Sequence, residues 1–117
     1  MKVHDGYVYW LEYQAKLVMR VRTDGTGAPE QIATTDPNPF ALVVDASGVY
    51  RASSGAAQTG AEGSLARAPL TPGGKTTVMM KNVRNTYDLA ADGEAIYVSL
   101  VGAQLGQGKI QRIAKVK

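Results

Sequence analysis

The chain has 117 residues, which leaves room for one domain or for part of one. It contains no cysteine, so disulfides, thiolate metal sites and cysteine nucleophiles are excluded, and no apolar run approaches the roughly 18 residues of a membrane-spanning helix. The net charge is +3, but the 13 basic residues are scattered, whereas a nucleic-acid-binding surface needs them clustered on one face. We therefore expect neither a nucleic acid nor a membrane as a partner.

The first residues, Met1–Gly6, lack the apolar core of a signal peptide. The sequence does not define a compartment. It is consistent with a cytoplasmic protein, or with a secreted or periplasmic one from which a signal has been removed.

Residues 1–34 read as four short strands. Val, Ile, Thr and Tyr recur there at short alternating intervals, which is typical of strands, and no stretch keeps the spacing of an amphipathic helix. The expected strands are Met1–His4, Tyr7–Leu11, Lys16–Arg22 and Glu30–Thr34.

The same order of strands returns twice. Residues 38–81 are expected to form the strands Phe40–Val44, Val49–Ala52, Ser64–Leu70 and Thr76–Lys81. Residues 85–117 are expected to form Tyr87–Ala91, Ala95–Leu100 and Lys109–Val116, and the last repeat stops there, after its third strand.

Individual residues recur in register along these repeats. Tyr9, Tyr50 and Tyr97 are separated by 41 and then 47 residues. The offset of 47 is shared by the pairs Asn38/Asn85, Phe40/Tyr87, Leu42/Leu89, Val44/Ala91 and Asp45/Asp92. An apolar-x-Arg triplet in each third strand ends in Arg20, Arg67 or Arg112.

A repeat of this length with four strands is typical of a propeller blade. The expected fold is therefore an all-β propeller arc of about three four-stranded blades, half of a six-bladed ring, with blades at residues 1–34, 38–81 and 85–117. A generic β-sandwich is the alternative.

Tight turns are expected between the first and second strands of each repeat. Asp5-Gly6, Asp45–Gly48 and Asp92-Gly93 occupy these places. Because aspartate and glycine supply the positive-φ positions of short hairpins, each is predicted to be such a turn.

An arc of three blades leaves the outer faces of its end blades in water. Six large apolar side chains left exposed would cost roughly 10–20 kcal/mol, which rivals the stability of a whole domain. A second copy placed head to tail would cover both faces and close a ring of six blades. The sequence therefore predicts a head-to-tail homodimer.

The stretch Asp5–Trp10, the apolar-x-Arg strands and the segment Pro39–Asp45 resemble bacterial propellers with YWTD-like repeats. These are six-bladed rings of the low-density-lipoprotein-receptor type, similar to NHL-repeat proteins. Only the first repeat keeps the Tyr-Trp pair, as Tyr9-Trp10, and the Thr-Asp part of the motif is absent. The resemblance implies a six-bladed fold and a role in binding proteins or glycans, although a few such proteins are lyases or lactonases.

Binding groups are expected at the end of the blades that carries the longer connections. Two of these loops are alike, and offer Gln58 and Gln104 to a polar ligand unless they are plain connections. Trp10, Glu12 and Tyr13 end a strand near the same face. Trp10 has two interpretations, a stacking platform for a sugar or peptide, or a side chain packed between blades.

Asn38 and Asn85 begin strands next to the expected central channel. With Glu12 they offer oxygen ligands to a hard cation such as Ca²⁺, or each asparagine simply caps its own turn. We expect no cofactor, no resident metal and no catalysis, and hence a binding or scaffold module. The alternative function is a metal-dependent hydrolase or lyase with its site at the channel mouth.

Overall fold

The computed structural model describes residues 1–35, 39–53, 63–72, 74–83, 86–100 and 109–115. This part of the chain is all-β and contains no helix, and therefore none long and apolar enough to cross a membrane. Its eleven strands are β1 Lys2–His4, β2 Tyr7–Glu12, β3 Leu17–Arg22, β4 Glu30–Thr34, β5 Pro39–Asp45, β6 Gly48–Ser53, β7 Gly63–Ala68, β8 Thr77–Val83, β9 Thr86–Ala91, β10 Ala95–Leu100 and β11 Lys109–Ala114.

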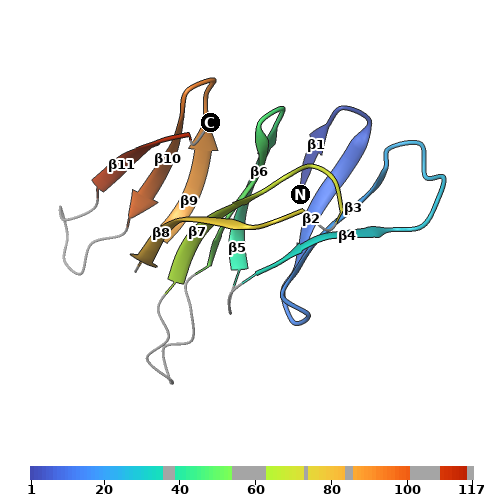
Figure 1. Ribbon diagram of the computed structural model, residues 1–117, viewed down its shortest axis with the longest axis horizontal. Helices are drawn as coiled ribbons and strands as arrows, with labels where there is room; N and C mark the ends of the chain where they lie inside the picture. The colour runs from blue at the N-terminus through green and yellow to red at the C-terminus, as the bar shows by residue number, and fades with distance from the viewer. Residues whose placement is uncertain (36–38, 54–62, 73, 84–85, 101–108, 116–117) are drawn as a thin grey trace.

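The strands form three antiparallel sheets, each a simple meander in chain order (Figure 1). The first sheet is β1-β2-β3-β4, the second is β5-β6-β7-β8 and the third is β9-β10-β11. The expected all-β fold is confirmed. Two sheets have four strands and the third has three in the described residues, which is the order expected from the sequence, although not every sheet has the four strands of a full blade. The three sheets stand as an open array, and no closed ring is seen.

The first turn has the backbone that its sequence predicts. Asp5 and Gly6 both have positive φ, 46° and 82°, and they join β1 to β2 where His4 pairs with Tyr7. Two consecutive positive-φ residues give the hairpin a twist that matches its strands, and Asp-Gly adopts this conformation at little cost.

The turn before β10 is built differently. The predicted turn does join β9 to β10, but Gly93 is not among the described residues with positive φ, so the backbone conformation predicted for it is wrong. The Asp92 carboxylate holds the turn instead, because it accepts hydrogen bonds from the backbone N–H groups of Glu94 and Ala95 at 2.8 and 2.9 Å. It also accepts one from the Tyr97 hydroxyl at 2.7 Å.

These donors lower the pKa of Asp92 to about 2, the backbone N–H of Glu94 first, then the Tyr97 hydroxyl and the Ala95 N–H. Because the folded-state pKa lies below the ordinary value of about 3.9, the turn gains stability above that value and loses it as the pH falls toward 2. We expect the Asp92 carboxyl carbon to titrate near pH 2 in an NMR experiment. The substitution Tyr97→Phe, which removes one donor, should raise the midpoint, and an Asp92 midpoint near 4 in the unmodified protein would contradict the turn structure.

The first strands of the three sheets lie next to one another. β5 contacts β1 and β2 on one side and β9 on the other, and β6 also contacts β9. The sheets therefore pack most closely at their first strands, as successive layers along the chain (Figure 1).

The core between the first and second sheets is formed by side chains from both. Tyr9 and Val18 of the first sheet meet Leu42 and Val49 of the second, and all four are buried. The remaining buried members of this cluster are Ile32, Ala33 and Ala68. Arg20 extends the contact, since its Nη1 donates to the Leu70 carbonyl at 2.8 Å.

The opposite face of the second sheet packs on the third. Successive residues of a strand point to opposite faces, so Leu42 faces the first sheet and Ala41 the third. The second cluster contains the buried residues Ala41, Tyr50, Ala52, Leu65, Leu89, Ile96 and Val98. The second sheet is thus covered on both faces.

An ion pair adds to the contact between the second and third sheets. The Lys115 ammonium, just after β11, donates to the Asp45 carboxylate and to the Asp92 carbonyl. Burial by itself raises the pKa of Asp45, but hydrogen bonds from Lys115 and Ser47 outweigh it and hold that pKa below its usual range. Lys115 also lies 5.6 Å from the centre of the Tyr50 ring.

Candidate functional site

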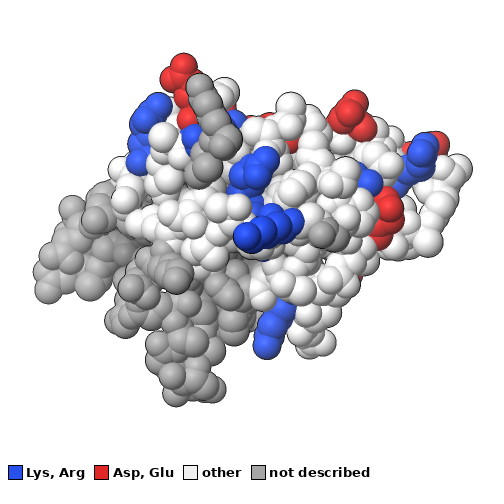
Figure 2. All heavy atoms as spheres, viewed as in Figure 1, with Lys and Arg blue, Asp and Glu red and all other residues white. Residues whose placement is uncertain are grey.

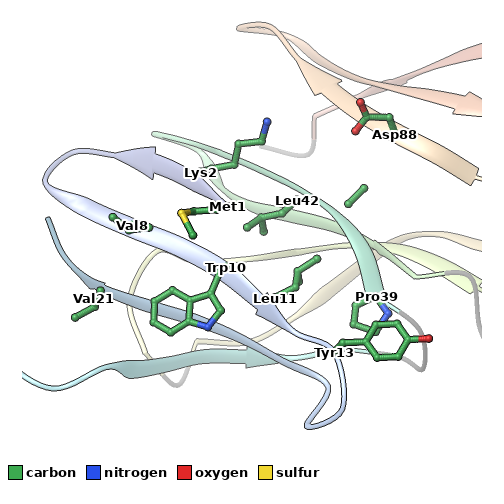
Figure 3. A pocket seen from close by; sticks show the side chains of 11 residues that line it. Met1, Lys2, Val8, Trp10, Leu11, Tyr13, Val21, Pro39, Leu42 and Asp88 are labelled. Atoms are coloured by element: carbon green, nitrogen blue, oxygen red, sulfur yellow. The ribbon is translucent and has the colours of Figure 1, made fainter.

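A hollow of about 840 Å³ lies beside the first strands of the three sheets (Figure 3). It takes side chains from β1, β2, β3, β5 and β9, so all three sheets contribute to it. The lining residues are Met1, Lys2, Val8, Trp10, Leu11, Tyr13, Val21, Pro39, Ala41, Leu42 and Asp88. Most of these are apolar, which is the usual character of a binding cavity.

The aromatic wall of the hollow comes from the end of β2 and the turn after it. Trp10 is partly exposed, and its indole Nε1 donates to the Glu12 carboxylate at 2.8 Å. Residues two apart on a strand share a face, so this hydrogen bond restrains the orientation of the ring. Tyr13 is 58% exposed and lies with Pro39 at one end of the hollow (Figure 3).

The two charged residues of the hollow lie at its other end. Lys2 belongs to β1 and Asp88 to β9, so they come from the first strands of different sheets (Figure 3). Together the groups provide ring faces for stacking, an apolar floor and one charge of each sign. This arrangement can bind a ligand, and among the described residues that line the hollow no nucleophile is paired with a base.

Of the candidate residues from the sequence, the structure brings three together. Trp10 and Tyr13 line the hollow, and Glu12 is bonded to the Trp10 ring without lining it. Asn38, Asn85, Gln58 and Gln104 lie outside the described residues. Among the residues that are described, no three His, Asp or Glu side chains are grouped closely enough to hold a metal ion.

Sequence reasoning missed Lys2, Pro39, Leu42 and Asp88 as parts of the hollow. They belong to three strands that are far apart in the sequence, and they meet only because β1, β5 and β9 lie side by side. The signal that would have found them is their place in the first strands of the repeats, next to the expected channel.

A smaller space of about 110 Å³ lies between the first and second sheets around Arg51. The Arg51 side chain is buried, and its Nη2 donates to the Thr34 carbonyl at 2.8 Å and to the Thr76 hydroxyl at 3.0 Å. These contacts link the first sheet to the second, so this arginine has a structural role.

Charged side chains are dispersed over the described residues of the face viewed in Figure 2. Figure 2 shows basic and acidic groups in small, separate clusters on the face that it views, with wide areas free of charge between them. This distribution agrees with the scattered basic residues of the sequence.

No protein-family model matches the chain, and a comparison with curated proteins found no match.

Proposed function

We propose that this chain is a non-catalytic binding or scaffold module of the β-propeller type, akin to YWTD and NHL repeats. Three sheets form half of a ring, and a second copy, joined head to tail, supplies the other half. The ligand is a protein or a glycan.

The observation that carries this proposal is the arrangement of β1, β5 and β9. Each is the first strand of its own meander, and β5 contacts both of the others. In a propeller the first strands surround the axis and the sheets spread outward from it. Two clusters of buried side chains between successive sheets are also what stacked blades require.

The hollow supports a binding role. Its apolar floor and the exposed Tyr13 ring beside Pro39 suit the apolar faces of a sugar or of a peptide side chain. Its position beside the first strands corresponds to the mouth of a propeller channel.

The solution mass tests the proposal. The chain has a mass of 12.4 kDa, so sedimentation equilibrium at micromolar concentration should give twice that value. Closure by a second copy requires this mass, because the two end sheets otherwise keep one face each in water. A stable monomer over the same concentration range would contradict the proposed ring.

A further inference from the structure

The three sheets present equivalent faces in the same order. We call the face that carries Tyr9, Tyr50 or Tyr97 the tyrosine face of its sheet, and the other its rear face. Tyr9 packs into the core with the second sheet and Tyr50 into the core with the third. At both contacts, the tyrosine face of one sheet therefore meets the rear face of the next.

The tyrosine face of the third sheet has no such cover among the described residues. Arg112 pairs with Tyr97 and Ile110 with Ser99, so these side chains share that face. Ile110 is 69% exposed, whereas Val18 and Leu65, which begin the same apolar-x-Arg triplet in the other repeats, are fully buried. The repeat thus leaves in water an isoleucine at a position that is otherwise inside a core.

The rear face of the first sheet is apolar, and no described part of the chain covers it. Register places Val3 beside Val8 and Met19 beside Trp10 on this face. Val3 is 69% exposed, and the partly exposed side chains around it are Val8, Trp10, Met19 and Val21.

The positions equivalent to Val8 and Trp10 are buried in both of the other sheets. Trp10 corresponds in the repeat to Arg51 and Val98, and Val8 corresponds to Val49 and Ile96. All four of these residues are buried against the preceding sheet. Trp10 therefore stands where the fold elsewhere places a contact between sheets.

From this equivalence we infer that the rear face of the first sheet, centred on Trp10, docks on the tyrosine face of the third sheet of a second copy. The contact continues the pattern of the two internal ones, with Ile110 in the place of Val18 and Leu65. Trp10 is its anchor, since a large aromatic side chain at the centre of a desolvated face gives the greatest binding energy. The inference rests on the proposed ring and specifies which surfaces close it.

Two substitutions test the assignment, one on each open face. Val3→Asp and Ile110→Asp each place a carboxylate where an apolar contact is expected, and both positions are exposed, so each variant should fold as the unmodified protein does. A charge buried in the contact should weaken self-association by about a hundredfold or more.

Val78→Asp is the matched control, because Val78 is 47% exposed and lies on β8, the last strand of the second sheet. Circular dichroism and urea midpoints establish that all three variants are folded.

A mixture of the two variants gives the sharper result. In a ring made of one variant alone, each of the two contacts between copies includes one substituted face. Each variant alone should therefore sediment as a monomer. In a mixture, the intact rear face of the Ile110→Asp chain meets the intact tyrosine face of the Val3→Asp chain. One undamaged contact is restored, and we expect a heterodimer in the mixture and an unchanged dimer for Val78→Asp.

The outcomes separate this inference from the proposed function. If the unmodified chain is a dimer and both variants remain dimers, or if the mixture stays monomeric, the face assignment is overturned and the ring is not. If the unmodified chain is a monomer, both are overturned. If it forms larger assemblies that both variants abolish, the faces are correct and closure by two copies is wrong.

Discussion

Replacing Tyr50 by alanine should lower the free energy of unfolding by about 3–5 kcal/mol, the usual cost of deleting a large buried aromatic side chain. Tyr50 is fully buried between the second and third sheets, where it contacts a cluster that includes Leu65 and Ile96. Its hydroxyl is hydrogen bonded to the Ser47 hydroxyl at 2.7 Å, so the substitution also removes a partner from that turn. Urea unfolding followed by the fluorescence of Trp10, the single tryptophan, measures the loss.

The matched control is Tyr13→Ala. Tyr13 is of the same residue type but is 58% exposed, so we expect a change of about 0.5 kcal/mol or less. Both variants should be compared at one protein concentration, because association contributes to apparent stability. Equal losses for the two substitutions would mean that the second and third sheets do not form a joint core.

The substitution Gly48→Ala should destabilise the protein by about 2–4 kcal/mol, through backbone strain and overpacking together. Gly48 begins β6 with a φ of 146°, a backbone conformation that residues other than glycine rarely adopt. An added Cβ would lie 2.7 Å from the Ala68 carbonyl oxygen and 2.9 Å from the Arg67 Nε. Because β6 and β7 are hydrogen bonded beside this point, the carbonyl cannot move away without breaking the pairing.

Gly93→Ala is the comparison for this prediction. Gly93 occupies the corresponding turn of the last repeat, has no positive φ, and leaves open space around an added Cβ. We expect its urea midpoint to stay close to that of the unmodified protein. A Gly48→Ala variant as stable as the Gly93→Ala variant would contradict the geometry at the start of β6.

The strands and their order could be predicted because the same pattern of strand and turn residues occurs three times along the chain. Tyr9, Tyr50 and Tyr97 lie at the same place in β2, β6 and β10, each paired with the arginine of the following strand. Alternation of apolar and polar residues is typical of strands with one buried side, so the strands and their order followed from the sequence.

The hollow could not be predicted in the same way. Lys2, Pro39 and Asp88 have no shared local pattern, and only the packing of first strands from different sheets brings them to one place. The backbone conformation of the turn at Gly93 could not be predicted from the local sequence either. An Asp-Gly pair is equally compatible with a positive-φ hairpin and with a turn capped by the aspartate side chain.

Trp10 illustrates how the structure changes the interpretation of a residue. The sequence left open whether this ring stacks on a ligand or packs between blades. Its equivalence to the buried residues Arg51 and Val98 favours packing against another sheet, with only the rim of the hollow, near Tyr13 and Pro39, left for a ligand.

The central claim is that three successive sheets form half of a ring that a second copy completes. An experimental structure of the assembled protein tests it most directly. We predict six sheets around one axis, with β1 of each copy beside β9 of the other and Trp10 buried. A structure in which the rear face of the first sheet remains in water, or in which two rear faces pack on each other, would contradict it.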